Sequence, residues 1–278
     1  MKKITLFCLL AAVMLFAASC RHSEKTIVFQ NYEYEDNPFA ETDDTVGVQF
    51  SIKIQLPLLE KATEAQRPLM QAMTDSLLTR LLEPYYNGKA PDQAIKDYCD
   101  SIRSEFNDWA LLDDPTESGT PNYQWIQELS LVPELETEQM LVYNGSIYAY
   151  TGGEHPSTTT ILFLFDLNTG KQLTEQELFT WAGDAPNSES YNAFVELMKG
   201  MIRKMCDATD DFTADDIDWD NVAPNGNFKV TKDALVYHFD VYEITNTNAG
   251  PIDIVLPNHE VKQFMKEGTV LYNYWFKK

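Results

Sequence analysis

An alternating run from Val46 to Leu56 is the feature that most constrains the fold. Apolar side chains occupy every second position, at Val46, Val48, Phe50, Ile52, Ile54 and Leu56. Successive side chains of a strand point to opposite faces, so the run predicts a strand with one buried face. Such a strand needs neighbouring strands and a layer that covers its apolar side, and the chain must therefore build a layered sheet.

Two amphipathic helices are predicted after this strand. Between residues 68 and 82 the side chains of Leu69, Met73, Leu77 and Leu81 recur every four residues. Pro91 suits the first turn of a second helix, in which Ile95, Tyr98, Ile102 and Phe106 follow at helical spacing. We expect both helices to cover the first strand, which gives a strand-helix-helix domain over residues 46–139.

The second half of the chain is predicted to be richer in strands. Asn144-Gly145 lies between strand-forming residues and predicts a two-residue hairpin, because both central residues of that turn need a positive φ. A strand over 159–165 and a turn over 166–171 follow. Thr174 and Glu177 have the spacing of a capping box and predict the start of a short helix.

The remaining segments complete an α+β pattern. We expect a helix over about 188–206, strands over 228–230 and 235–241 joined by a turn, a short helix from Pro257 to near Gly268, and a final aromatic strand over 270–276. The predicted fold has antiparallel sheets with helices packed on one side, divided into two small subdomains. The second subdomain covers residues 140–278.

The first twenty residues have the features of a lipoprotein signal peptide. Two lysines precede an apolar run from Ile4 to Ala18, and Ala17-Ala18-Ser19-Cys20 resembles the bacterial lipobox. This predicts lipidation at Cys20 and anchoring to a membrane outside the cytoplasm, in the periplasm or on the outer surface; the alternative is an ordinary cleaved signal. Residues 21–45 are polar and acidic and predict a tether with one short strand near 26–29.

Cys99 and Cys206 remain after the signal is removed, in a compartment that permits oxidation. A disulfide between them would close a long loop and stabilise the fold by roughly 4 to 5 kcal/mol. Both cysteines lie in predicted helices, where buried thiols are common. The sequence therefore favours two free thiols and leaves the disulfide as the alternative.

The chain is strongly acidic, with a formal net charge of −22 at pH 7. This charge repels nucleic acids and anionic headgroups, and it attracts basic partners through a long-range field that salt weakens. Acidity also keeps exported proteins soluble. The charge is thus compatible with a basic protein partner without requiring one.

The motifs of common enzymes and metal sites are missing from the sequence. The four histidines show no zinc-binding spacing, no Gly-x-Ser-x-Gly element is present, and the aspartate run at 216–220 departs from a calcium loop at Asn221 and Asn227. We expect no metal, no cofactor and no catalytic residues. A glycosidase needs only two carboxylates, so a hydrolase stays open as an alternative.

The stretch Tyr150 to Thr158 contains Gly152, Gly153, Glu154 and His155 in succession. The glycines permit a positive φ and Pro156 stiffens the exit, so the stretch predicts a connection between two strands. A loop that contacts a partner is the second interpretation. An acid-base pair of Glu154 and His155 is the third, although neighbours in a strand face opposite sides and no nucleophile lies beside them.

A series of motifs in the second half resembles a known extracytoplasmic domain. The motifs are Tyr150-Thr-Gly-Gly-Glu-His, Phe165-Asp-Leu-Asn-Thr-Gly-Lys171, Phe228 to Phe239, Tyr242-Glu-Ile and Ala249-Gly250 to Pro257. This set is similar to the domain shared by RsiV-type anti-sigma factors and PdaC-type peptidoglycan deacetylases. Glu154 and Pro156 replace the usual Ala and Gly of its glycine turn.

The resemblance implies an α+β fold and a binding role, since the domain lies outside the catalytic domain of the deacetylases and binds lysozyme in the anti-sigma factors. We therefore expect a lipid-anchored, non-enzymatic module of the cell envelope. Its expected partner is a cell-wall glycan (peptidoglycan) fragment or a basic, lysozyme-like protein, and not nucleic acid. The alternatives are a carboxylate-dependent peptidoglycan hydrolase and a structural envelope lipoprotein.

Overall fold

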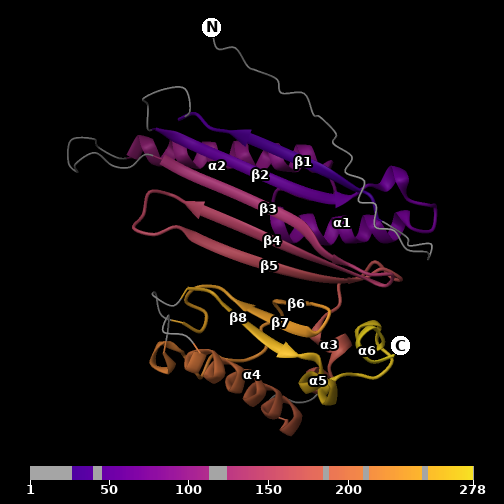
Figure 1. The fold of residues 1–278 in the computed structure, drawn as a ribbon. Helices are drawn as coiled ribbons and strands as arrows, with labels where there is room; N and C mark the ends of the chain where they lie inside the picture. Colours follow the sequence, from indigo (N-terminus) through magenta and orange to yellow (C-terminus); the bar gives the residue numbers. More distant parts are fainter. Residues whose placement is uncertain are drawn as a thin grey trace.

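The computed structural model of the protein describes residues 27–39, 46–112, 124–183, 188–208, 213–245 and 250–277. The predicted signal peptide and Cys20 lie outside the described residues. The described chain forms two sheets, one of five strands and one of three, with helices against each (Figure 1). This is the α+β fold that the sequence predicts.

The five-stranded sheet has the order β1-β2-β3-β4-β5. Its strands are β1 (Phe29–Asp36), β2 (Gly47–Pro57), β3 (Gln124–Glu136), β4 (Met140–Tyr150) and β5 (Ser157–Asp166). All neighbours are antiparallel except β2 and β3, which pair in parallel. The strand β1 lies inside the segment expected to be a tether. The sheet also continues across residues 139 and 140, where the sequence suggested a domain boundary.

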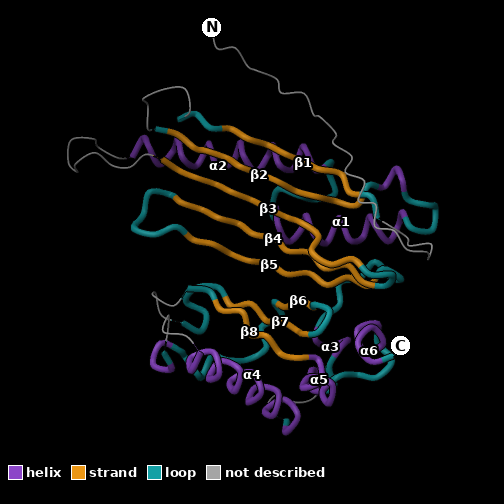
Figure 2. The backbone as a smooth tube through the Cα atoms, in the orientation of Figure 1, coloured by secondary structure: helices purple, strands orange, loops and turns teal. Residues whose placement is uncertain are grey.

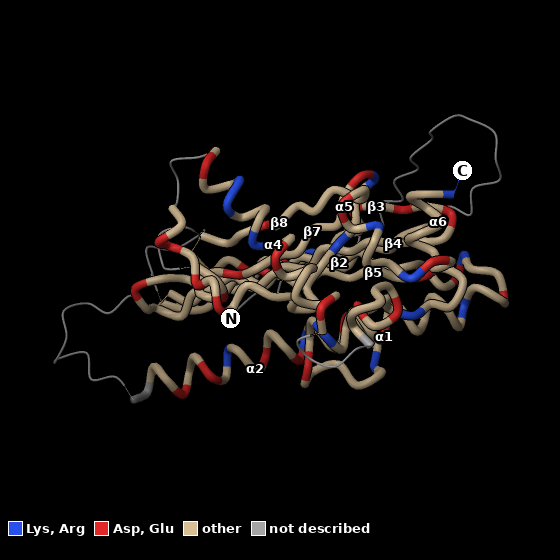
Figure 3. Tube along the Cα trace, turned by 90° about the horizontal axis from the view of Figure 1, so that it is seen from below, with Lys and Arg blue, Asp and Glu red and all other residues tan. Residues whose placement is uncertain are grey.

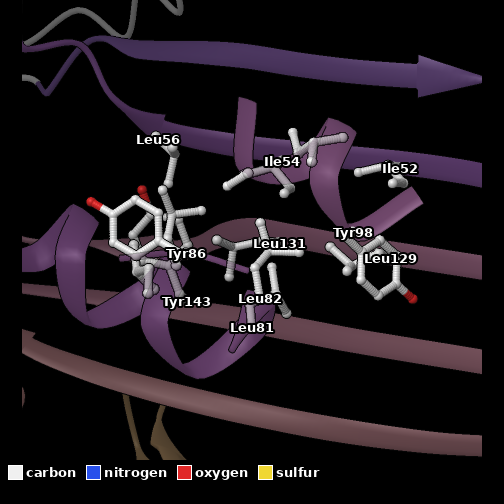
Figure 4. Close-up of a cluster of buried hydrophobic side chains, with 14 of the residues drawn as sticks. Ile52, Ile54, Leu56, Leu81, Leu82, Tyr86, Tyr98, Leu129, Leu131 and Tyr143 are labelled. Atoms are coloured by element: carbon white, nitrogen blue, oxygen red, sulfur yellow. The ribbon is translucent and has the colours of Figure 1, made fainter. Parts of the chain in front are cut away.

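The predicted alternation explains the first core. Phe50, Ile52 and Ile54 of β2 are at most 1% exposed. They face α1 (Arg67–Leu82) and α2 (Pro91–Leu112), which cover one face of the sheet (Figures 1 and 4). These helices form the long crossover that a parallel β2-β3 pair requires. A short 3₁₀ turn, η1 (Leu59–Lys61), joins β2 to α1.

The three-stranded sheet has the order β6-β7-β8, with β6 (Phe228–Val230), β7 (Ala234–Phe239) and β8 (Ile252–Pro257). The helical elements of this half are α3 (Glu175–Leu178), η2 (Trp181–Gly183), α4 (Glu189–Ala208), η3 (Ala214–Asp216), α5 (Asn258–Val261), η4 (Lys262–Phe264) and α6 (Val270–Phe276). Met140, Val142 and Leu164 from the larger sheet complete its core. The two subdomains therefore share strands β4 and β5.

The hairpin expected at Asn144-Gly145 is wrong, because both residues lie within the continuous strand β4. The chain reverses earlier, at residues 137–139 between β3 and β4. A Cβ atom on Gly145 would lie 3.3 Å from the carbonyl oxygen of Ile161 and 3.6 Å from Cδ1 of Leu81. The close approach is therefore to the backbone of the neighbouring strand β5, since 3.6 Å to Leu81 is ordinary van der Waals contact, and no turn with a positive φ is involved.

The final aromatic segment is also corrected, from a strand to the helix α6. The Thr269 hydroxyl oxygen accepts a hydrogen bond from the Tyr272 N–H at 3.2 Å and caps the helix. Tyr272 and Phe276, four residues apart, make an edge-to-face contact with ring centroids 5.2 Å apart. A cap and helical spacing thus override the strand propensity of aromatic residues.

Cys99 and Cys206 are free thiols. Cys99 is buried in the core of the larger sheet, whereas Cys206 is packed against the core of the smaller one. Burial raises the pKa of Cys99 to about 12, so this thiol is unreactive at neutral pH. The disulfide alternative is not formed in this structure.

Candidate functional site

The predicted glycine stretch forms the loop between β4 and β5, as the sequence indicates (Figure 2). Gly152 has a φ of 84°. All four residues of the stretch, Gly152, Gly153, Glu154 and His155, are exposed. Within the described structure, neither Glu154 nor His155 has a hydrogen bond or an ion pair. The loop therefore has the accessibility of a contact surface, and its acid and histidine are not held in an acid-base geometry.

A cleft of about 590 Å³ runs along β5, the strand that begins at the end of this loop. We call it the β5 cleft. One wall is helix α1 with the residue that follows it, the floor is the edge of β5, and the other wall comes from the smaller subdomain. Its lining residues are Asp75, Ser76, Thr79, Arg80, Glu83, Thr159 to Phe163, Gln172, Asn225 to Asn227, Asp240 and Glu243.

The charge of the β5 cleft is negative. Its lining carries four carboxylates and one guanidinium, a formal charge of −4 + 1 = −3. Asp75 is already engaged, since it accepts hydrogen bonds from the Tyr86 hydroxyl at 2.5 Å and from the Gln71 amide at 2.8 Å. Glu83 and Arg80 are exposed on the α1 side of the cleft and Glu243 on the opposite side.

Asn227 joins the wall from the smaller subdomain to the floor of the cleft by pairing with the edge of β5. Its side-chain oxygen accepts a hydrogen bond from the Leu162 N–H at 2.8 Å, and its amide nitrogen donates to the Thr160 carbonyl at 2.8 Å. The side chain thus imitates the backbone of a neighbouring strand. Asp240 adds to this pairing, because its carboxylate accepts from the Thr160 N–H at 3.0 Å. An edge strand is protected in this way from pairing with another chain.

His238 holds Asp240 in place. This side chain is 9% exposed, and its ring nitrogens lie 2.7 Å from Oδ1 of Asp253 and 3.1 Å from Oδ1 of Asp240. Burial alone would lower the pKa of His238, but the hydrogen bonds with the two carboxylates outweigh this effect and raise the pKa. The protonated imidazole can donate to both carboxylates at once.

The turn that carries Asn227 is positioned by the predicted capping-box helix. Glu175 at the start of α3 accepts hydrogen bonds from the Gly226 N–H at 3.0 Å and from the Tyr237 hydroxyl at 2.9 Å. Burial raises the pKa of Glu175, and the two hydrogen bonds oppose that rise. Thr174 and Glu177 form the capping box itself. The short helix that begins with this capping box therefore holds the Asn227 turn in place through Glu175, a role that the motif itself does not indicate.

Tyr242 is the most unusual residue at the rim of the β5 cleft. It is 62% exposed and has a φ of 74°, the left-handed conformation that a bulky residue rarely adopts. It occupies the third position of a turn that is closed by the Glu243 N–H and the Asp240 carbonyl at 3.1 Å. The turn presents the aromatic ring to solvent beside Glu243, a lining residue of the cleft.

The structure also bears on metals and membranes. No group of three or more His, Cys, Asp or Glu side chains in the described ranges is arranged to hold a metal ion. None of the helices in the described part of the chain is long and apolar enough to cross a membrane. Acidic residues occur along the chain in both subdomains (Figure 3).

Comparisons with solved structures support the fold. A crystal structure of a DUF3298 family member from Bacteroides fragilis superposes with a TM-score of 0.75 at 19% identity, and covers 92% of this chain and 99% of its own. A DUF3298 family protein from Pseudomonas aeruginosa gives a TM-score of 0.55 at 14% identity, and covers 88% of this chain and 96% of its own. At these identities the likeness shows the arrangement of the chain alone.

Sequence comparisons agree with this assignment. The immunogenic proteins MPB64 of Mycobacterium bovis and MPT64 of Mycobacterium tuberculosis are each 24% identical over 194 residues, which is 66% of this chain and 75% of theirs. The family model described as "Protein of unknown function (DUF3298)" matches residues 171–259. That range includes α3, the Asn225 to Asn227 turn, His238 and Asp240. The segment that matches the DUF3298 model therefore supplies one wall of the β5 cleft.

Proposed function

We propose that the protein is a lipid-anchored, non-enzymatic binding module of the cell envelope, with a basic wall-acting protein of the lysozyme type as its partner. The observation that carries this proposal is the β5 cleft, where four carboxylates and one arginine line a groove next to an exposed loop. Negative lining complements a basic surface and steers its approach. The net charge of −22 acts in the same direction.

Tyr242 fits this role as a contact residue. Exposed tyrosines are enriched among the residues that dominate binding energy. Tyr242 directly precedes Glu243 in the sequence. An arginine or lysine of the partner could therefore lie over the tyrosine ring and pair with the Glu243 carboxylate. The RsiV/PdaC-like resemblance of the sequence supports the same class of partner.

A cell-wall glycan is the second candidate partner. Thr159, Thr160, Gln172, Asn225 and Asn227 give the β5 cleft hydroxyl and amide groups that suit sugar hydroxyls. Several of these groups are already used inside the protein, as the bonds of Asn227 to β5 illustrate. For this reason the charge of the cleft favours the basic protein.

Hydrolysis in the β5 cleft has less support. A carboxylate pair for glycoside cleavage needs one group that is free to donate a proton and one that is free to attack or to activate water. Asp75, Asp240 and Glu243 all accept hydrogen bonds within the protein, Glu243 from the Asp240 N–H at 2.6 Å. Release of reducing ends from purified peptidoglycan, abolished by Glu83→Gln or Glu243→Gln, would replace the binding proposal with the hydrolase.

Binding is tested by calorimetry with the chain from residue 20 onward carrying Cys20→Ser. We expect it to bind hen lysozyme, with an affinity that falls as salt is added, and soluble muropeptides more weakly. The double variant Glu83→Gln and Glu243→Gln should weaken lysozyme binding by about 1 kcal/mol, roughly fivefold. Glu128→Gln on β3 removes one carboxylate outside the cleft and is the control. Absence of binding to both ligands at high micromolar concentration would refute the proposal.

The anchor is tested separately in cells. Incorporation of labelled palmitate should depend on Cys20 and be lost in Cys20→Ser. Cys8→Ser changes the other cysteine of the signal segment and should keep the label. A wild-type protein that is secreted without the label would exclude the lipid anchor and leave the binding proposal to its own test.

A further inference from the structure

A second pocket lies at the opposite edge of the five-stranded sheet, beside β1. It has a volume of about 350 Å³, near the lower end of the roughly 300–1,000 Å³ range of ligand pockets. We call it the β1 pocket. It is lined by Gln30, Tyr32, Leu56 to Glu60, Gln71, Thr74, Tyr86 and Gly88 to Pro91. It shares no lining residue with the β5 cleft.

The polar groups of the β1 pocket are largely unused. Within the described structure, the side chains of Gln30, Tyr32 and Glu60 have no hydrogen-bond partner. Thr74 is 6% exposed, and its buried hydroxyl also lacks a partner. A buried hydroxyl without a hydrogen bond is costly, and native proteins seldom leave one in that state. Gln30 and Tyr32 are half-buried and Glu60 is exposed, so the buried Thr74 hydroxyl is the group of this pocket that points to a ligand supplying the missing partner.

Thr74 can present its hydroxyl to that ligand. The side chain is part of the pocket wall, while its oxygen lies just beneath the surface. Threonine in a helix adopts two side-chain rotamers, and a change between them exchanges the hydroxyl and the methyl group. Such a change of rotamer requires no movement of helix α1.

The charges around the β1 pocket disfavour anions. Lys89 is the one cation in the lining, and its ammonium group is paired with Asp97 at 2.5 Å. The carboxylates of Glu60 and Asp92 are then left as negative charges near the pocket. Burial raises the pKa of Tyr32, and these two negative charges raise it further. A phosphate or carboxylate ligand would meet uncompensated negative charge. A neutral or cationic ligand would not.

The apolar part of the lining forms one continuous region. Leu56 and Tyr86 belong to the buried core under the sheet, and they appear together in the core close-up (Figure 4). Pro57, Leu58 and Leu59 extend this apolar region toward the surface. A ring with one apolar face and hydroxyl groups around its edge would match this lining.

We propose that the β1 pocket binds a single hydroxylated ring that is neutral or cationic, the chemistry of a monosaccharide or an amino sugar. Its hydroxyl groups pair with Gln30, Tyr32 and Thr74, and Glu60 accepts from a hydroxyl or an ammonium group. Its apolar face lies on Leu56 to Leu59. The proposal concerns a separate cavity from the β5 cleft, and it does not depend on a basic protein binding there.

The test is a titration of the chain from residue 20 onward, with Cys20→Ser, followed by NMR. We expect saturable shifts with glucosamine or N-acetylglucosamine and none with glucuronate, which carries a negative charge. Weak millimolar affinity is the expected range for so small a ligand. Absence of shifts with both amino sugars at about 100 mM, or equal binding of glucuronate, would overturn the proposal.

Two variants locate the site. Thr74→Val removes the unpartnered hydroxyl with little change of shape, so it should raise the melting temperature of the free protein and weaken sugar binding at least fivefold. Tyr32→Phe should weaken binding and leave the fold intact. Ser104→Ala, an exposed hydroxyl on helix α2 that lines neither cavity, is the control. Sugar binding that Thr74→Val and Tyr32→Phe both leave unchanged would show that the sugar binds elsewhere.

Discussion

The two edges of the five-stranded sheet are finished in opposite ways. At the β5 edge, side chains from the smaller subdomain pair with the backbone, as Asn227 and Asp240 do with Thr160 and Leu162. At the β1 edge, polar side chains such as Gln30 and Tyr32 surround a pocket without partners. Polar groups at the β5 edge therefore hold the fold together, whereas Gln30 and Tyr32 at the β1 edge make no such bonds in the described structure.

The largest expected effect is at the end of the β5 edge. Gly170 has a φ of 70°, and a Cβ atom there would lie 2.6 Å from the Leu69 carbonyl oxygen. Gly170→Ala should lower the free energy of unfolding in urea by about 3 kcal/mol, because backbone strain and steric overlap add. Gly88→Ala beside the β1 pocket has a similar φ of 82° with open space around it, and should cost about 1 kcal/mol. Equal losses would contradict the packing argument.

Asn227 tests the edge pairing directly. Asn227→Ala leaves the Leu162 N–H and the Thr160 carbonyl without their partners, and it should lower the free energy of unfolding by about 2 kcal/mol. Asn31→Ala on β1 removes a side chain that pairs with nothing in the described structure and should cost less than about 0.5 kcal/mol. A small effect at Asn227 would remove the contrast between the edges.

The pH dependence of stability is the third test. The pKa of His238 is raised in the folded protein, so its contribution is fully present below the unfolded value of about 6.5 and is lost as the pH rises through the folded value. Urea unfolding should therefore show stability falling by about 1 kcal/mol above pH 6.5, where deprotonation weakens the hold on Asp240.

His238→Gln should flatten that part of the pH profile. His259→Gln changes an exposed histidine outside the network and should leave the profile unaltered. A rise of stability with pH in the wild-type protein over this range would contradict the assigned role of His238. Hydrogen exchange of the Thr160 amide reports on the β5 edge alone. We expect the pH dependence of stability to be concentrated at this edge.

The smallest effect is expected at the rim of the β5 cleft. Asparagine tolerates a left-handed φ better than tyrosine, and Tyr242 buries little surface. Tyr242→Asn should therefore raise the free energy of unfolding by about 0.5 kcal/mol while it weakens lysozyme binding. Tyr148→Asn on β4 makes the same exchange in a strand and should lower stability. If Tyr242→Asn leaves binding unchanged, the residue is not a contact.

Local patterns predicted the elements well where the cause is local. The alternation from Val46 to Leu56 became β2, and the capping box at Thr174 became the start of α3. The hairpin prediction at Asn144-Gly145 failed because the glycine lies close to the backbone of Ile161, which is distant in sequence. A local sequence pattern contains little information on such long-range packing. An Asn-Gly pair that is required by packing therefore looks the same as one that forms a turn.

The two cavities could not be predicted from the sequence. The β5 cleft combines Arg80, Thr160 and Asp240, which come from three distant segments. The loop between β4 and β5 was expected correctly, yet the pairing of the Asn227 side chain with β5 carried no signal in the sequence beyond the Asn225-Gly226 dipeptide that precedes it. The unpartnered hydroxyl of Thr74 looks in the sequence like any polar position on a helix face.

The parallel pairing of β2 with β3 governs the order in which the polypeptide can assemble. As the chain is synthesised from its amino end, β1 and β2 can pair early, but the next neighbour of β2 follows the whole α1–α2 crossover. Contacts so far apart in sequence form late and slow folding. Until β3 is made, the edge of β2 that pairs with it has no partner strand, and unpaired strand edges of this kind are prone to aggregation.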